Sequence, residues 1–264
     1  MRISILTVCP ELFSSFLQSH EVKRAAERSS AEVEVIDIRE FAPGSFRHID
    51  DSPYGGGRGM VLRCQPVADA VESVKKRGAD DQKRAGADIS VRTILLSPAG
   101  TVYDQKKARE LAAQDHLILV CGHYEGFDAR IYPLADELIS VGDYILTGGE
   151  LPAMTVADSV LRLLEGNLKE GGSAEESFEN GLLEYPQYTK PAEFRGQTVP
   201  EILLSGDHEA VRKWRLKAAL KETMERRPEL LKGRKFTGEE KELLRELEEQ
   251  EALLGELNKQ QERQ

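Results

Sequence analysis

The stretch best suited to bind a ligand lies at residues 141–154, which read VGDYILTGGELPAM. Three glycines join an expected strand, 137–141, to an expected helix that begins near Pro152. Glycine allows backbone angles and close approaches that a Cβ would forbid, and proline suits a first helical turn. Backbone N–H groups left free at such a joint can hold a polar or anionic ligand. Taken alone, the glycines favour a simpler interpretation, a tight strand-to-helix turn.

Two more strand-like segments end in loops rich in glycine or proline. The first reads LLSPAG over residues 95–100, and the second reads LILVCGHYEG over residues 117–126. Ligands of open α/β sheets bind at the carboxyl ends of the strands, so three such loops can form one pocket. A turn explains each loop alone, whereas their joint occurrence favours a binding site.

A fourth glycine-rich stretch, DDSPYGGGRGM, spans residues 50–60. It is not a dinucleotide-binding fingerprint, because Met60 stands where a third glycine is needed and a proline precedes it instead of a buried strand. No phosphate-binding P-loop sequence occurs in the chain either. Either a flexible surface loop or a backbone surface that lies close to a flat or phosphate-bearing ligand explains this stretch.

Some charged and aromatic side chains also allow two interpretations. Arg162, on the helix before residue 165, has no evident place on an apolar face. Glu175 and Glu176 are either solvated charges or, on a loop that folds over a pocket, a general base whose pKa is raised by burial. Trp214 could stack on a nucleic-acid base, although a packing role on its helix is favoured.

No metal site is predicted. Three histidines lack partners at metal-ligand spacing, namely His48, His116 and His208. The three cysteines are too widely spaced for a disulfide framework or a zinc motif, namely Cys9, Cys64 and Cys121. Cys121 follows an apolar strand and is interpreted as a small buried residue, not a nucleophile.

The elements that must position these residues alternate between strand-like and helix-like segments. Strands are expected at 3–8, 33–38, 92–96, 117–121 and 137–141, and helices at 11–17, 22–28, 66–76, 104–113 and 152–164. This alternation predicts an α/β domain with a mainly parallel sheet. The charged segment 75–88 is expected to be a solvated loop.

The alternation stops at residue 165, which suggests a second domain. Glycines and polar residues between 165 and 176 indicate a flexible linker. Beyond it, helices are expected at 207–225 and 238–258. The predicted organisation is an α/β domain at 1–164, a linker at 165–176 and a small, mostly helical domain at 177–264.

Composition and charge restrict the possible partners and location of the protein. The formal net charge is −10, yet residues 212–235 hold ten basic and three acidic side chains, so this stretch carries 10 − 3 = +7. Such a local basic region keeps nucleic acid open as a partner. No apolar run reaches the roughly 20 residues that a membrane helix needs. We therefore expect a cytoplasmic protein without a membrane segment.

Several long motifs occur in an order that resembles the bacterial tRNA (guanine-N1)-methyltransferases of the SPOUT superfamily. They include the glycine-rich stretch 53–60 and the three loops above, followed by GLLEYPQYT at 181–189, LLSGDH at 203–208 and Trp214-Arg215. The resemblance covers almost the whole chain; only segment 75–88 and the C-terminal tail lie outside it.

The resemblance implies both an activity and a fold. Members transfer a methyl group from S-adenosyl-L-methionine to N1 of guanosine 37, immediately 3′ of the tRNA anticodon. It implies a parallel sheet with a C-terminal trefoil knot at about 92–164 that binds the donor, and a C-terminal tRNA-binding domain. It also implies a homodimer whose active sites lie at the subunit interface. Magnesium dependence is a family expectation that no motif here establishes.

Carried over to this chain, the resemblance assigns a role to each matching position. The donor-binding residues would be Leu95, Leu96, Ser97, Pro98, Gly122, Tyr124, Glu125, Gly126, Val141, Gly142, Tyr144, Leu146, Gly148, Gly149 and Pro152. The tRNA substrate would contact Tyr54, Gly55, Gly56, Gly57, Arg58, Gly59, Glu184 and Arg215. Arg162 would stabilise negative charge on the guanine O6, and Glu176 would act as the general base.

One departure from the family pattern concerns that base. The family usually has Glu-Asp-Ser-Phe where this chain has EESF at 175–178, so Glu176 replaces an aspartate. Because a shift of about 1 Å at a catalytic group can cost about 100-fold in rate, an alternative is a weakened or inactive SPOUT-fold RNA-binding protein. A second alternative, a dehydrogenase-like nucleotide-binding enzyme, lacks the required fingerprint.

Overall fold

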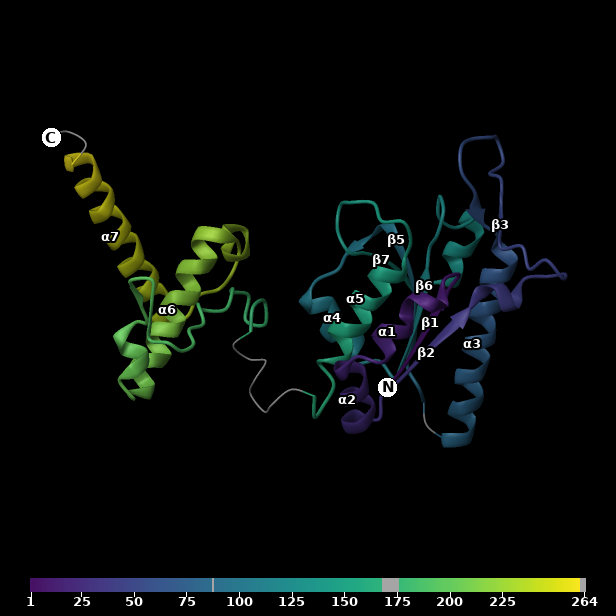
Figure 1. Ribbon diagram of the computed structural model, residues 1–264, viewed down its shortest axis with the longest axis horizontal. Helices are drawn as coiled ribbons and strands as arrows, with labels where there is room; N and C mark the ends of the chain where they lie inside the picture. Colours follow the sequence, from purple (N-terminus) through teal and green to yellow (C-terminus); the bar gives the residue numbers. More distant parts are fainter. Residues whose placement is uncertain (87, 168–175, 262–264) are drawn as a thin grey trace. The chain divides into compact units, whose positions relative to one another are not determined.

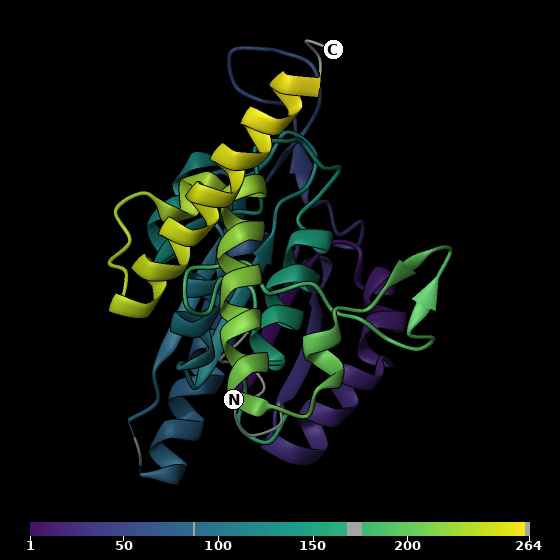
Figure 2. The ribbon, with the colours of Figure 1, turned by 90° about the vertical axis from the view of Figure 1, so that its left-hand side faces the viewer.

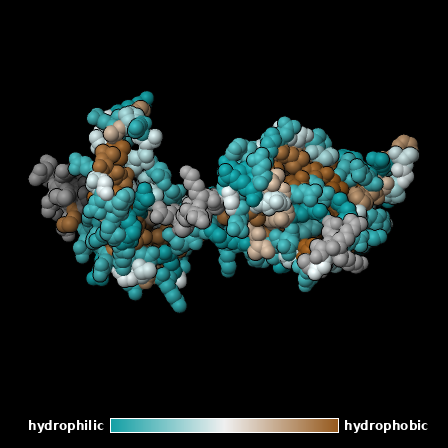
Figure 3. Space-filling view, turned by 90° about the horizontal axis from the view of Figure 1, so that it is seen from below, coloured by the Kyte–Doolittle hydropathy of each residue, from teal (hydrophilic) through white to brown (hydrophobic). Residues whose placement is uncertain are grey.

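The structure is a computed structural model that describes residues 1–86, 88–167 and 176–261. The chain divides into two compact units, Met1–Lys169 and Glu170–Gln264, and each has its own hydrophobic core. The division falls within the expected linker. No helix in the described ranges is both long and apolar enough to cross a membrane. The face drawn in Figure 3 is mostly hydrophilic, with smaller apolar areas on each unit.

The first unit is built on a five-stranded sheet with the strand order β2-β1-β6-β5-β7 (Figure 1). Its strands are β1 (Arg2–Thr7), β2 (Glu32–Asp37), β5 (Val91–Val102), β6 (His116–Cys121) and β7 (Glu137–Ser140). All neighbouring strands pair in parallel, which confirms the predicted parallel sheet. All six residues of the central strand β6 are buried, as expected for a sheet covered on both faces.

Helices lie on both faces of this sheet (Figure 1). One face carries η1 (Pro10–Phe13), α1 (Ser14–Leu17), α2 (His20–Ser29), α4 (Gln105–Ala112) and α5 (Glu150–Leu161). The other carries α3 (Cys64–Ala85), η2 (Ile38–Phe41) and η3 (Ala129–Leu134). Alternate residues of β6 enter the two cores, so Leu119 packs on the α5 side and Ile118 on the α3 side.

The charged segment 75–88 was wrongly predicted as a loop, because α3 continues through it as far as Ala85. Much of this segment consists of alanine, lysine, arginine and glutamine, which are strong helix formers. Lys76, Arg77 and Asp80 are exposed on it, so the charge of this part of the segment belongs to a solvated helix face. The helix stays close to the sheet at Gly78, where an added Cβ would lie 3.3 Å from Nδ1 of His116.

The strand predicted at 92–96 was expected to end at Leu96. Instead, β5 continues and pairs with β7 again after a bulge. Leu96 and Thr101 both pair with Ile139, and the register shifts between them. Such a bulge lets the residues between the two pairs leave the ladder. Gly100 is required in it, because an added Cβ would lie 2.4 Å from the backbone nitrogen of Ile139.

The second unit is mostly helical and contains η4 (Glu201–Leu204), α6 (His208–Arg226), η5 (Pro228–Leu231) and α7 (Gly238–Gln261). Its core includes Leu182, Leu220 and Leu243. Asp207 caps α6, and its side chain accepts hydrogen bonds from the backbone nitrogens of the first turn. A hairpin of β8 (Glu193–Phe194) and β9 (Gln197–Thr198) stands away from α6 and α7 (Figure 2).

Candidate functional site

A cavity of about 250 Å³ lies beside the bulge in β5 and at the carboxyl ends of β6 and β7. This bulge and the loops that follow β6 and β7 supply most of its wall, together with the start of α5. The lining residues are Leu96, Ser97, Pro98, Gly122, His123, Tyr124, Glu125, Gly126, Phe127, Tyr132, Ile139, Ser140, Val141, Gly142, Tyr144, Ile145, Leu146, Thr147, Gly148, Gly149 and Pro152.

The three loops expected to meet do surround this one cavity. Fourteen of the fifteen residues assigned to the donor line it, and Leu95 does not. Leu95 is 1% exposed and packs with Ile118 and Val120 in the core beneath α3. Its neighbour Leu96 reaches the cavity because successive side chains of a strand point to opposite faces of the sheet.

Close backbone contacts hold two of the loops together. The backbone nitrogen of Gly149 donates a hydrogen bond of 2.7 Å to the carbonyl oxygen of Gly122. His123 and Gly148 form an isolated antiparallel bridge beside it. An added Cβ on Gly149 would lie 2.7 Å from the Cα of Cys121, so a glycine is needed for this approach. The wall of the cavity at this point is therefore fixed by the backbone.

The glycine-rich stretch 50–60 forms β3 (Asp50–Asp51) and a hairpin loop, 52–60, that leads to β4 (Val61–Leu62). Its base is joined to the cavity wall, because the backbone nitrogen of Glu125 donates to the carbonyl oxygen of Met60 over 3.0 Å. At its tip, Tyr54 is completely exposed. The structure thus brings one end of the expected tRNA-contacting loop beside the expected donor residues and leaves the tip open.

The two residues expected to be catalytic belong to different units. Arg162 is half-buried at the end of α5 in the first unit, one helical turn after Asp158. Burial, and then the nearby Glu21, raises the pKa of Asp158, whereas Arg162 lowers it. Glu176 is half-buried at the start of the described part of the second unit. Glu175 lies outside the described residues.

The other two residues expected to contact tRNA lie near each other in the second unit. The guanidinium of Arg215 on α6 lies 4.8 Å from the centre of the Tyr185 ring, a cation–π contact. Glu184, next to this tyrosine, accepts a hydrogen bond of 2.5 Å from the side chain of Gln187. Its backbone nitrogen donates to Oγ of Ser177, which connects this region to the segment that holds Glu176.

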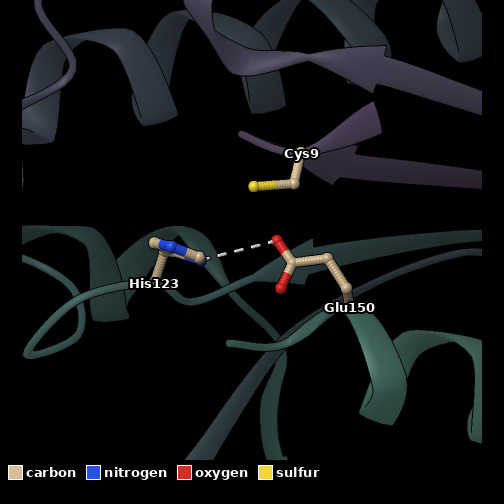
Figure 4. A group of neighbouring side chains, drawn as sticks. All are labelled: Cys9, His123 and Glu150. Atoms are coloured by element: carbon tan, nitrogen blue, oxygen red, sulfur yellow. Dashed lines mark ion pairs between the residues drawn. The ribbon is translucent and has the colours of Figure 1, made fainter. Parts of the chain in front are cut away.

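A group that the sequence analysis did not identify lies beside the cavity. Cys9 follows β1, His123 follows β6 and Glu150 begins α5, and Figure 4 shows their side chains converging. Thr7 donates a hydrogen bond of 2.7 Å to Oε1 of Glu150. The same carboxylate oxygen lies 3.8 Å from Nδ1 of His123. Adjacent strands explain the meeting of Cys9 and His123, but their adjacency cannot be read from the sequence.

The surroundings raise the pKa of two cysteine thiols here, Cys9 in the group and Cys121 beside it. Burial, followed by the negative charge of Glu150, raises the pKa of the Cys9 thiol. The same two causes raise the pKa of the fully buried Cys121 well above its usual range. A thiol whose pKa is raised is a poor nucleophile. This agrees with the interpretation of Cys121 as a small buried residue.

Comparison with known proteins links the chain to one family. Residues 1–233 match the family model described as tRNA (Guanine-1)-methyltransferase TrmD. A tRNA (guanine-N(1)-)-methyltransferase of Halalkalibacterium halodurans is 50% identical over 254 residues, which cover 95% of this chain and 99% of the relative. A protein of the same name from Geobacillus kaustophilus is 51% identical over 252 residues, which cover 95% and 99%. One from Listeria welshimeri is 49% identical over 248 residues, which cover 93% and 98%.

Proposed function

The chain belongs to the tRNA (guanine-1)-methyltransferase family, and we propose that it transfers a methyl group from S-adenosyl-L-methionine to N1 of guanosine 37 in tRNA. The main structural support is the convergence of the β5 bulge and the loops after β6 and β7 on one cavity. The relatives' shared name disfavours an inactive RNA-binding protein.

The chemistry of the lining suits this donor better than a nucleotide that carries phosphate. The residues that line the cavity, all of them described, include the carboxylate of Glu125 and no lysine or arginine. S-adenosyl-L-methionine has a positively charged sulfonium and no phosphate, so it needs no basic lining. Leu96, Ile139 and Pro152 supply apolar surface for the adenine. When bound, the donor supplies an electrophilic methyl group.

This fit changes the interpretation of residues 141–154. The glycines do not hold an anion at a helix N-terminus in this proposal; they let the backbone approach an uncharged ring. The fourteen lining residues named above are the proposed donor contacts. We assign Leu95, which is buried behind them, a supporting role in the wall.

The hairpin loop 52–60 is the proposed contact for the target nucleotide. Its junction with Glu125 places its base at the rim of the cavity, and its exposed tip offers Tyr54 and Arg58 to RNA. An exposed tyrosine can stack on a base, and an arginine can bind a phosphate. The open glycines between them allow the loop to adjust around the nucleotide.

In the proposed reaction, Glu176 accepts the N1 proton as N1 attacks the methyl carbon of the donor. The bond between that carbon and the sulfonium sulfur breaks, and S-adenosyl-L-homocysteine leaves. Removing that proton makes N1 a better nucleophile and leaves negative charge on the guanine O6. The guanidinium of Arg162 stabilises that developing charge. These roles come from the family resemblance. Both residues are half-buried, which suits groups that act on a bound substrate.

The variant Glu176→Gln tests this assignment, because it keeps the size of the side chain and removes its basicity. We expect methyl transfer to tRNA transcripts to fall by about 100- to 10,000-fold, the usual contribution of a general base, with donor affinity by calorimetry unchanged. Glu176→Asp, which restores the usual family residue, is the matched control and should keep activity. Near-wild-type turnover of Glu176→Gln would reject the assignment and make Glu175 or Glu184 the next candidate.

The architecture of the family completes the proposal. The family resemblance implies a trefoil knot at about 92–164, the part of the chain that holds the lining residues of the cavity. A homodimer with active sites at the subunit interface would cover exposed apolar side chains such as Leu151 and Ile145. We propose that the protein is located in the cytoplasm. The family resemblance also implies that the activity depends on magnesium.

The second unit, which includes the whole of the predicted domain at 177–264, is the proposed tRNA-binding part. Its basic stretch is partly neutralised, since Arg212 pairs with Glu239 and Lys217 pairs with Glu246 of α7. Lys232 and Lys235 have no ion pair with another described residue. They are the better candidates for phosphate contacts, which would make tRNA binding depend strongly on salt.

A further inference from the structure

Cys9, His123 and Glu150 form a group whose chemistry is independent of methyl transfer. Each residue offers one atom that commonly binds metals: a thiol sulfur, an imidazole nitrogen and a carboxylate oxygen. These atoms all lie within 4.8 Å of one another. The three residues come from the ends of β1 and β6 and the start of α5, so the fold itself assembles the group (Figure 4).

Two neighbouring residues arrange the group further. Thr7 donates to Oε1 of Glu150 over 2.7 Å and accepts a hydrogen bond of 2.9 Å from the backbone nitrogen of Cys9. It therefore fixes both residues, as an outer-shell partner does in a metal site. The glycine at 148 leaves the space open, because an added Cβ would lie 2.2 Å from Oε2 of Glu150 and 2.8 Å from Nδ1 of His123.

The group has unmet electrostatic and hydrogen-bonding requirements. Nδ1 of His123 is buried without a hydrogen-bond partner. The carboxylate of Glu150 is only 4% exposed, and the ion pair recorded for it, to His123 at 3.8 Å, requires a protonated imidazole. A buried carboxylate without a compensating charge is costly. A divalent cation between these atoms would satisfy both requirements.

We propose that Cys9, His123 and Glu150 form a zinc site with a fourth position left for water. Thiolate, imidazole and carboxylate together suit zinc, whereas magnesium prefers oxygen ligands alone. Tetrahedral zinc ligands lie roughly 3.5 Å apart, so the side chains must move closer by about 1 Å on binding. Binding converts the Cys9 thiol to a thiolate and releases its proton to solvent.

The site is tested by titrating the full-length, chelator-treated protein with Co²⁺, a spectroscopic substitute for zinc, and then with Zn²⁺. We expect one equivalent of Co²⁺ to produce a thiolate-to-cobalt charge-transfer band that Zn²⁺ abolishes. Cys9→Ser should remove the band and weaken Zn²⁺ binding by more than about 100-fold. Thr7→Val should weaken it by roughly 10- to 100-fold, the usual effect of losing an outer-shell partner.

The matched control is Cys64→Ser, because Cys64 is a free and partly exposed cysteine outside the group. It should keep both the band and the affinity. Circular dichroism verifies that each variant is folded. A wild-type protein without the band, a band that persists in Cys9→Ser, or a band lost in Cys64→Ser would overturn the proposal. Because neither tRNA nor donor is used, failure here would leave the proposed methyl transfer untouched.

Discussion

Two glycine-rich regions of the first unit use the same residue type for opposite purposes. At Gly149 an added Cβ would lie 2.7 Å from backbone atoms, although the φ angle of −83° suits any residue. At Gly56 nothing lies within 4 Å of an added Cβ, but the φ angle of +78° favours glycine. The first glycine allows a close packing contact in the cavity wall, and the second allows a turn in an open loop. The proposed donor site is thus preformed, whereas the proposed nucleotide contact has room to move.

The largest expected effect comes from Gly149→Ala. Its Cβ would force apart the backbones of two strand-end loops, so we expect a loss of about 3 kcal/mol in the free energy of unfolding. Donor affinity should fall with it, because the same contact forms the cavity wall. Urea unfolding and calorimetry measure the two effects. An alanine variant with unchanged stability and affinity would show that the wall is not held as tightly as we infer.

A smaller effect is expected from Tyr54→Ala at the tip of the hairpin loop. The side chain is completely exposed, so its removal should leave stability and donor affinity unchanged. Loss of a stacking contact should weaken tRNA binding by about 1–3 kcal/mol, measured by filter binding at fixed salt. Tyr54→Phe keeps the ring and serves as the control. Equal tRNA affinity of the alanine and phenylalanine variants would argue against a stacking role.

The smallest effect is expected from Gly56→Ala, which is also the control for the cavity wall. No neighbour obstructs the new Cβ, so only the positive φ angle opposes it, at a cost of about 1 kcal/mol or less if the loop relaxes. Donor affinity should not change. If this variant destabilised the protein as much as Gly149→Ala, the contrast between the two regions would be wrong.

The sequence was enough to predict that three glycine-containing segments meet at one cavity. The prediction uses the rule that ligands bind at the carboxyl ends of parallel strands, and this rule needs only local patterns. Apolar runs followed by glycine mark strand ends, and parallel strands bring those ends to one edge of the sheet. The alternation of side chains along β5, which turns Leu95 away from the cavity, was available in the sequence and was overlooked.

Other features could not be predicted from local patterns. The bulge after Leu96 depends on how β5 meets β7, and the proximity of Thr7 to Glu150 spans 143 residues of sequence. The group that includes Cys9 arises from the adjacency of β1 and β6, which spacing along the chain does not reveal. The roles proposed for Arg162 and Glu176 come instead from the family motifs. The two residues belong to different units, so the geometry of one unit alone does not suggest these roles.

The most direct test of the central claim is to map the modified nucleoside. A tRNA transcript with guanosine at position 37 is treated with the purified protein and S-adenosyl-L-methionine, digested, and examined by mass spectrometry. We expect one 1-methylguanosine, located at position 37, and none in a transcript that has adenosine there. A methyl group at another atom or position, or no methyl transfer by a protein that binds the donor, would contradict the proposed function.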